Sequence, residues 1–367
     1  MTHDRKRLSA WLLAGLVLVT VITLYQTQRT GMGQPVADPC AQSAPGCPGP
    51  GTSPPPTPAP SPDPSAGETA SSTSAPPSAT PPPGSSGPPA PSPAACSSPG
   101  ACGFPDASTT GPRIELERHD TGNMSVKTDG TVIKGWDIHG SLDIYANDVT
   151  VIDSRITSTN WWGINLRPGF SGLKVLYTTI TAIPGKGPDN GGVNYAVSNM
   201  GGSSIEVGWC DISVFGNALS MGQGDLHDNY VHDIVAFRNK TGEWQHTDAV
   251  ISGGGNKGRL TVRHNTLLNP VRVDQGATAA VGLFADTGVV SSVAVERNWL
   301  AGGAYSLYGG GPGATGIKVT DNVFSAEYHP AAGVYGTATA WNAGGAGNVW
   351  SGNRMADGKP VPPPASP

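Results

Sequence analysis

The chain has 367 residues, with 22 lysines and arginines against 27 aspartates and glutamates, and a formal net charge of −5. Only 13% of its residues are charged, which argues against a nucleic-acid-binding protein because such a protein needs a basic face. The 51 glycines and 35 prolines belong mainly to the turns of a repeat and to one long proline-rich segment.

Residues 1–30 are predicted to form a cytoplasmic flank and a transmembrane signal anchor. Arg5, Lys6 and Arg7 precede an uncharged run of 18 residues from Leu8 to Tyr25, and such a helix would reach roughly 27 Å, close to the thickness of a bilayer core. The basic flank predicts a single-pass protein of the cell membrane whose C-terminal part is extracellular. Cleavage of the run as a signal peptide, which would make the protein secreted, is the alternative.

Residues 31–112 read as a disordered linker rich in proline, serine, alanine and glycine. Such a segment cannot bury enough apolar surface to offset its loss of conformational entropy. A largely polyproline-like linker of this length would extend on the order of 250 Å. We therefore expect a stalk that carries the following domain away from the membrane.

Four of the five cysteines lie in this linker. In an oxidising space, Cys40 with Cys47 and Cys96 with Cys102 would close two small disulfide loops, although the sequence leaves the connectivity open. Cys210 lies in the repeats described below, and we expect it to be a buried free thiol.

A repeat occupies residues 113–358, and residues 359–367 are predicted to be a disordered tail. Nine apolar positions recur at intervals of 18 to 36 residues, namely Ile138, Ile156, Ile180, Ile212, Val231, Leu267, Leu300, Phe324 and Met355. This irregular but persistent recurrence predicts one structural unit per turn of a solenoid. The residue two places earlier is an asparagine in the last five repeats, namely Asn229, Asn265, Asn298, Asn322 and Asn353.

Asparagine tolerates a left-handed bend, and its amide can bond to copies in the turns above and below. We therefore expect a polar ladder at one corner, which includes Cys210 in an earlier repeat. A second short strand that ends in glycine precedes each corner, as in AVISGGG and YSLYGGG. The pattern resembles the right-handed parallel β-helix of the pectate-lyase-like superfamily. The resemblance implies an all-β solenoid that is extracellular and acts on polysaccharide, and we expect a monomer.

Three long excursions leave the repeat at the same position, just before a second strand. They span residues 182–194, 232–247 and 269–278. Because they belong to nearby turns of the solenoid, we expect them to project on one side and to form one wall of a cleft. The strands themselves are committed to stacking, so these excursions are the predicted location of the chemistry.

The middle excursion contains most of the candidate site residues. It holds two cations, two carboxylates, an indole and an imidazole within eleven positions, namely Arg238, Lys240, Glu243, Trp244, His246 and Asp248. Its segment HTDAV resembles a His-x-Asp element of bacterial extracellular β-helix proteins, but here Ala249 replaces the usual glycine. This resemblance implies that His246 and Asp248 face a carbohydrate groove.

Neighbouring turns add further candidates for substrate binding, namely Lys186 in the first excursion, Arg272 in the third, and Trp162 one turn earlier. Polygalacturonase-like hydrolases carry paired aspartates together with Gly-His and Arg-x-Lys signatures, and this complete set is not found in the sequence. The metal is left open: a divalent cation such as calcium would need clustered aspartates on successive turns, whereas Asp225, Asp228 and Asp233 are scattered by strand alternation.

These observations favour a polysaccharide lyase that breaks a uronic-acid-containing glycan by β-elimination. In this scheme Arg238 or Arg272 binds the carboxylate, and Lys240 or His246 removes the adjacent proton. Glu243, Trp244, Trp162 and Lys186 would complete the substrate-binding surface.

Two other classes of function remain open. A carbohydrate-binding or cell-wall adhesion module would need only the stalk and a long groove. A glycoside hydrolase would need two carboxylates, for which Glu243 and Asp248 are the candidates. An unsaturated product that absorbs in the ultraviolet would select the lyase, whereas binding without turnover would select the adhesion module.

Overall fold

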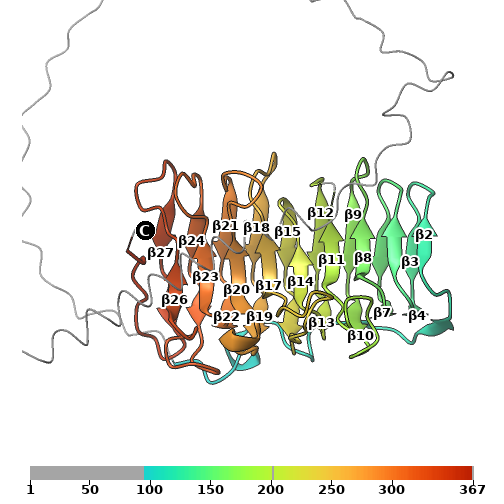
Figure 1. Cartoon of the computed structure of the whole chain (residues 1–367), viewed down its shortest axis with the longest axis horizontal. Coiled ribbons are helices and arrows are strands. Elements are labelled where there is room, and N and C mark those ends of the chain that lie inside the picture. The colour runs from blue at the N-terminus through green and yellow to red at the C-terminus, as the bar shows by residue number, and fades with distance from the viewer. Residues whose placement is uncertain (1–94, 201, 366–367) are drawn as a thin grey trace, which may run out of the picture. The chain divides into compact units, whose positions relative to one another are not determined.

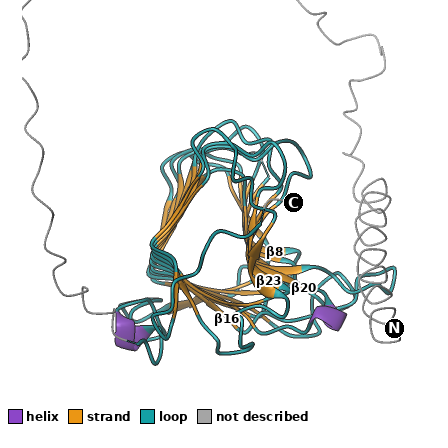
Figure 2. Cartoon of the chain, turned by 90° about the vertical axis from the view of Figure 1, so that its left-hand side faces the viewer, coloured by secondary structure: helices purple, strands orange, loops and turns teal. Residues whose placement is uncertain are grey.

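The computed structural model describes residues 95–200 and 202–365, which wind into a solenoid of three parallel β-sheets. We name them sheet A, which contains β1, sheet B, which contains β2, and sheet C, which contains β3. Successive strands pass from sheet A to B to C and return to sheet A one rung further on. Figure 1 shows the rungs in chain order along the long axis, and Figure 2 shows the triangular cross-section. The predicted parallel β-solenoid is confirmed.

Each rung contributes one short strand to each sheet. Sheet A consists of β1 (Glu117–His119), β4 (Trp136–His139), β7 (Arg155–Ser158), β10 (Thr179–Ala182), β13 (Asp211–Ser213), β16 (Tyr230–His232), β19 (Thr266–Asn269), β22 (Trp299–Gly302), β25 (Val323–Phe324) and β28 (Arg354–Met355). Sheet B consists of β2 (Met124–Val126), β5 (Leu142–Ile144), β8 (Trp162–Leu166), β11 (Tyr195–Asn199), β14 (Asn217–Ser220), β17 (Thr247–Ser252), β20 (Ala277–Leu283), β23 (Tyr305–Gly309) and β26 (Gly336–Thr339). Sheet C consists of β3 (Val132–Lys134), β6 (Thr150–Ile152), β9 (Leu173–Leu176), β12 (Ile205–Gly208), β15 (Gly224–His227), β18 (Leu260–Arg263), β21 (Val293–Glu296), β24 (Lys318–Thr320) and β27 (Val349–Ser351). Two short 3-10 helices, η1 (Gly100–Cys102) and η2 (Val273–Gln275), lie in connecting segments.

The nine apolar positions of the sequence repeat form one column in sheet A. Each is the strand partner of the next, from Ile138 opposite Ile156 to Phe324 opposite Met355. Eight of the nine are buried, and all but Met355 belong to the continuous apolar core. Burial of one aliphatic side chain per rung and per sheet supplies the main stabilisation of such a stack.

The predicted asparagine ladder is also confirmed. The side-chain oxygen of Asn298 accepts from both the backbone N–H of Asn265, at 2.9 Å, and its side-chain amide, at 3.0 Å. That same amide also donates to the carbonyl oxygen of Leu226. The pattern repeats at the other rungs, and the Cys210 N–H donates to the oxygen of Asn229. Cys210 is a buried free thiol, as predicted.

The expected position of the left-handed bend was wrong by one residue. The positive φ angles fall on the residue before each asparagine, for example 54° at Asp228, 52° at His264 and 57° at Asp321. The asparagine itself has to direct its amide into the solenoid to reach the next rung, so the turn is made immediately before it.

A strap, residues 96–113, runs along the corner between sheets C and A. The N–H of Cys96 donates to the carbonyl oxygen of Ala356 in the last rung, at 2.7 Å. A disulfide joins Cys96 to Cys102. This is one of the two disulfide loops predicted from the sequence. Phe104 is buried against Trp299, with ring centres 5.8 Å apart. The Thr266 hydroxyl donates to the carbonyl oxygen of Pro105.

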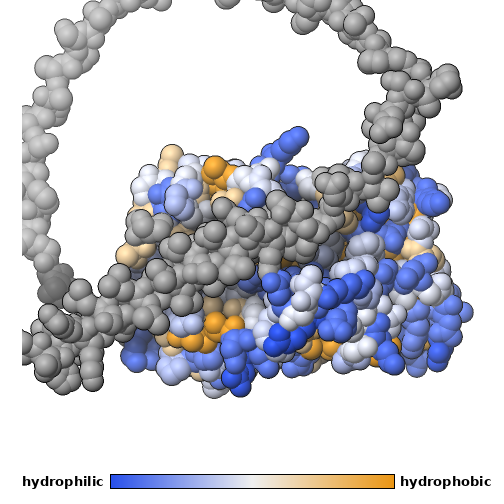
Figure 3. All heavy atoms as spheres, in the orientation of Figure 1, coloured by the Kyte–Doolittle hydropathy of each residue, from blue (hydrophilic) through white to orange (hydrophobic). Residues whose placement is uncertain are grey.

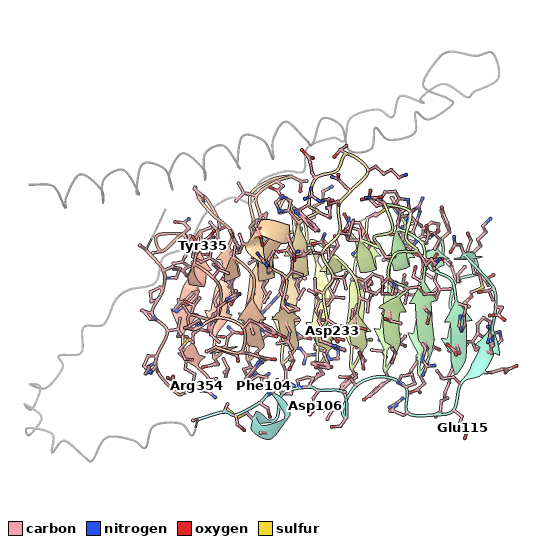
Figure 4. The ribbon with its side chains drawn as sticks, turned by 60° about the horizontal axis from the view of Figure 1, so that its bottom comes forward. Phe104, Asp106, Glu115, Asp233, Tyr335 and Arg354 are labelled. Carbon is pink, nitrogen blue, oxygen red and sulfur yellow. A yellow bond between two sulfur atoms is a disulfide. The ribbon has the colours of Figure 1, made fainter. Side chains whose placement is uncertain are left out.

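The strap ends at the opposite end of the solenoid. Gly111 N–H donates to the carbonyl oxygen of Trp209 at 2.9 Å. The Arg113 guanidinium binds both carboxylate oxygens of Asp153 at 2.8 Å and lies 3.5 Å from the centre of the Tyr177 ring. Figure 4 shows this path from Phe104 past Asp106 to Glu115. The strap thus connects the last rung to the first, although its sequence was assigned to the linker.

The predicted anchor, the linker up to residue 94 and the pair Cys40 and Cys47 lie outside the described residues. Within the part of the chain that the structure describes, no helix has the length and apolarity that a membrane crossing requires. Of the predicted tail, residues 359–365 are described, and Val361 is buried against the last rung, where its N–H donates to the Asn353 carbonyl oxygen.

Replacing Asn265 by leucine should lower the free energy of unfolding by about 1 to 3 kcal/mol, because the backbone and side-chain amides of Asn229 then lose their buried acceptor. Chemical denaturation measures the loss. Thr261→Leu, an outward-facing change in the same rung, is the control and should cost less than about 0.5 kcal/mol. An equally small loss in Asn265→Leu would show that water satisfies this corner.

Phe104→Ala should lower the free energy of unfolding by about 3 kcal/mol, because the strap loses its one buried aromatic ring. Hydrogen exchange should speed up at the amides of Cys96 and Phe104, while amides in β18 stay protected. Ile114→Ala, at a position 46% exposed, serves as the control. Unchanged exchange along the strap would mean that Phe104 does not hold it in place.

Candidate active site on the outer face of sheet B

The three excursions leave the solenoid at the corner between sheets A and B, after β10, β16 and β19. The backbone N–H of Lys240 in the second excursion donates to Oδ1 of Asp189 in the first, at 2.9 Å. His246 Nδ1 lies 3.1 Å from the hydroxyl oxygen of Thr278 in the third. The excursions are therefore in contact with one another and form a continuous border beside sheet B, as their spacing predicted.

The second excursion is a small hairpin in which Arg238 pairs with Trp244. The side-chain oxygen of Asn239 accepts the backbone N–H of Glu243 at 3.0 Å and closes the turn. The Arg238 guanidinium lies 4.5 Å from the centre of the Trp244 ring and donates to the carbonyl oxygen of Gly242. Arg238 and Glu243 are exposed, so the hairpin presents a fixed cation–aromatic pair to solvent.

Lys240 is exposed, and its ammonium group lies 5.6 Å from the centre of the Trp161 ring. The next residue, Trp162, is partly buried and starts β8, with the Arg167 guanidinium 5.5 Å from its ring centre. Two neighbouring tryptophans thus lie beside cations, namely Lys240 from the second excursion and Arg167, which follows β8 directly. This combination suits the faces and carboxylates of acidic sugars.

The other two predicted cations, Lys186 and Arg272, are not paired with an aromatic ring of the described residues as Arg238 and Lys240 are. Lys186 is exposed in the first excursion. Arg272 makes two hydrogen bonds to Asp274, at 2.9 and 2.7 Å, and both side chains are exposed. Because Asp274 already neutralises Arg272, this arginine is the weaker candidate for binding a substrate carboxylate.

Asp248, the second residue of β17, faces outwards but is covered. The adjacent Ala249 and Val250 both pack in the core. The usual alternation of inward and outward side chains is therefore interrupted between them, and the side chain of Asp248 lies on the outer face of sheet B. The residue is 0% exposed, and neither carboxyl oxygen makes a hydrogen bond of normal geometry. Burial therefore raises the pKa of Asp248 well above its usual value, and the group stays protonated where an ordinary aspartate is ionised.

His246 lies two residues earlier and is partly buried. Burial lowers the pKa of its imidazole, and the charge of Asp286 opposes this effect. The ring is therefore uncharged at neutral pH and can accept a proton. The environment thus displaces the pKa values of His246 and Asp248 in opposite directions, which is the arrangement expected of a base and an acid.

Sequence reasoning did not identify the role of loop 284–288, which follows β20. Phe284 packs against Tyr308 with ring centres 5.1 Å apart, and Asp286 acts electrostatically on both His246 and Asp248. The only signal was positional: the segment FADTG follows β20 one rung after the strand that carries Asp248. Burial and, after it, the charge of Asp248 raise the pKa of Tyr308.

A hollow of about 240 Å³ lies between the first two excursions. Ile183, Val235 and Phe237 give it an apolar lining, and Arg238 lies at its edge. On the face drawn in Figure 3, hydrophilic residues predominate and apolar residues form small patches. A ligand that combines apolar faces with many hydroxyl or carboxylate groups suits such a surface.

The residues considered for a cation do not form a shared site. Asp225 bonds to Arg263, Asp228 to His227 and His264, and Asp233 to His232. Each carboxylate thus faces its own partner. Among residues 95–200 and 202–365, no group of three or more histidine, cysteine, aspartate or glutamate side chains is arranged to hold a metal ion.

Comparison of the chain with models of protein families, with curated proteins and with solved structures gave no match. The candidate site is therefore defined by its own geometry. Its central feature is the pair His246 and Asp248 at the start of β17, bordered by exposed cations and aromatic rings.

Asp248→Asn should become more stable than the wild type as pH rises. The folded-state pKa of Asp248 lies above the unfolded value, so the folded wild type holds a proton that the unfolded chain releases, and its stability falls as pH increases above about 4. Urea denaturation between about pH 3 and pH 8 measures the difference. Asp225→Asn is the control at a partly exposed carboxylate. A difference independent of pH would contradict the protonated state.

Proposed function

We propose that this chain is an extracellular polysaccharide-active protein, and that it cleaves a uronic-acid-containing glycan by β-elimination. The observation that carries the proposal is the position of partly buried His246 and fully buried Asp248 two residues apart at the start of β17, where burial lowers the pKa of the imidazole and raises that of the carboxyl group. Neutral His246 takes the proton from the carbon next to the sugar carboxylate. The C–H electron pair forms the new double bond, the C–O bond breaks, and Asp248 protonates the departing oxygen.

Binding of the acidic polymer rests on the excursions. Exposed Lys240 above Trp161 and exposed Arg238 above Trp244 provide two positions where a cation adjoins an aromatic face. A uronate residue offers both a carboxylate and a sugar face to such a pair. Lys186 adds a third cation on the same side. Binding of the carboxylate also makes the adjacent proton more acidic, which assists its transfer to His246.

Hydrolysis of a glycosidic bond is the second candidate reaction. It is favoured by one observation: Asp248 has the raised pKa of a general acid, and a second carboxylate, Asp286, acts on it electrostatically. Glu243, the second carboxylate expected from the sequence, is exposed at the tip of the hairpin, where its Oε2 lies 3.2 Å from the Thr241 hydroxyl. Asp286 therefore replaces Glu243 in this candidate.

The proposal places the solenoid in the pectate-lyase-like superfamily with right-handed winding, which is the usual hand of parallel strand–crossover–strand connections. The proposed membrane attachment through residues 1–30, the extracellular location and the monomeric state rest on the sequence. A carbohydrate-binding module without turnover would use the same cations and aromatic rings, so turnover decides between enzyme and adhesion module.

The test is a screen of the full chain against acidic and neutral polysaccharides, with ultraviolet absorbance of the product as the measurement. His246→Ala and Asp248→Asn should each lower kcat by about 10² to 10⁴, because each removes one half of the proton transfer. Lys240→Ala and Arg238→Ala should mainly raise KM, because the cations bind the polymer before the reaction as well as during it.

Arg272→Ala is the matched control, because this arginine already pairs with Asp274, and it should leave both constants close to wild type. New reducing ends without ultraviolet absorbance would select hydrolysis. Full activity in both His246→Ala and Asp248→Asn would contradict the proposed site.

A further inference from the structure

An aromatic ring and the buried carboxyl group meet beside Gly282 in β20. A Cβ atom at Gly282 would lie 2.3 Å from Cε2 of Phe284 and 3.0 Å from Oδ1 of Asp248. The ring and the carboxyl group therefore border the same point on the outer face of sheet B. Glycine is required here because any side chain would displace Phe284 or press on the acid.

Phe284 is partly exposed, whereas Asp248 is wholly buried. The Phe284 ring is tilted by 52° against Tyr308, which is itself largely buried and responds electrostatically to Asp248. The ring of Phe284 thus has one side towards solvent and one side towards the acid. In this position the ring covers the carboxyl group of Asp248.

The backbone on both sides of this cover is fixed. The Phe284 N–H donates to the carbonyl oxygen of Ser252 at 2.8 Å, and the Thr287 N–H donates to that of Gly253 at 2.8 Å. The Thr287 hydroxyl also donates to the carbonyl oxygen of Gly254 at 2.9 Å. Opening therefore requires rotation of one side chain rather than displacement of the loop.

We propose that Phe284 is a gate over Asp248, whose ring shields the carboxylic acid at rest and turns aside when the oxygen atom of a ligand approaches. The gate is a property of the protein alone. It rests on the proposed function only in naming that oxygen as the glycosidic oxygen of a bound glycan.

The gate explains how a buried acid without a hydrogen bond of normal geometry stays protonated, although the backbone N–H of Ala279 favours its ionised form. Ionisable groups that act on Asp248 are Asp286 in loop 284–288 and Tyr308 in β23, and His246 lies two residues before it. None of them is a cation that would favour ionisation of the carboxyl group. Water entering beside Gly282 would solvate the carboxylate and release the proton, so the ring preserves the acid until a ligand displaces it.

Access can be measured without any glycan by treating the full chain at mildly acidic pH with a water-soluble carbodiimide, which modifies carboxyl groups that it can reach. Peptide mass spectrometry then reports the modification of Asp248. Phe284→Ala should increase this rate on the order of tenfold over wild type, because the cover is gone. Phe170→Ala, which removes a partly buried ring several rungs away, is the matched control and should leave the rate unchanged.

Two further variants keep the test informative if Phe284→Ala folds poorly. Gly282→Ala leaves the ring in the chain but forces it aside, so it should raise the rate as well. Phe284→Leu keeps an apolar side chain of smaller area and should give an intermediate rate. Equal rates in wild type, Gly282→Ala and Phe284→Leu would overturn the gate.

Infrared absorption of the carboxylic acid provides an independent measurement. Burial also raises the pKa of Asp143, so the band of Asp248 is obtained as the difference between each protein and its Asp248→Asn counterpart. In wild type the band should persist at neutral pH, and in Phe284→Ala it should disappear at lower pH because water stabilises the carboxylate. Absence of the band from wild type at neutral pH would also overturn the proposal.

On a glycan that the wild type cleaves, Phe284→Ala should shift the basic limb of the kcat profile to lower pH while Phe170→Ala leaves it in place. The gate and the proposed function can fail separately. Increased labelling of Asp248 without cleavage of any glycan would support the gate and contradict the lyase, whereas cleavage with unchanged labelling would do the reverse.

Discussion

The buried chain of asparagine amides at the corner between sheets C and A is the constraint on which the rest of the fold depends. From Asn265 onwards, each asparagine oxygen accepts the backbone N–H of the asparagine one rung earlier, so the ladder sets the register between rungs independently of what lies elsewhere in each turn. The intervals between successive asparagines can therefore vary from 24 to 36 residues without disturbing the stack. The long excursions are possible because this corner does not change.

Two corners of the solenoid, the one between sheets C and A and the one between sheets A and B, have different roles. The strap covers the asparagine corner and connects the last rung to the first, so this side is closed by Phe104, Arg113 and the disulfide loop. The corner between sheets A and B carries the excursions, which contact one another and hold cations above aromatic rings. A closed corner that maintains the register thus supports an open one whose loops carry polar side chains. Loops on a rigid scaffold are the usual location of binding and reaction.

Recurrence along the chain made the solenoid, the column of apolar residues, the ladder and the position of Cys210 predictable from sequence. The left-handed residue before each asparagine was not, because the repeat does not reveal which of two neighbours makes the turn. The strap was missed because its contacts depend on single residues, such as Phe104, within a composition typical of linkers. Asp286 and Phe284 were missed because their relation to Asp248 exists only between rungs, where strand partners are 30 or 31 positions apart in the sequence.

In the proposed lyase, the placement of the base and the acid would separate binding from reaction. The exposed cations on the excursions would attract an acidic polymer, whereas His246 and Asp248, whose pKa values are shifted towards their uncharged forms, lie closer to the sheet. An uncharged pair neither repels nor holds the carboxylate in the ground state. In the proposed reaction the interaction would become strong only when a proton leaves carbon for the imidazole and the acid gives its own to the leaving oxygen, since charge would then develop in a water-poor environment. A buried acid without a hydrogen bond of normal geometry destabilises the fold, and the parallel neighbours of β17 on both sides in sheet B help the stack to tolerate it.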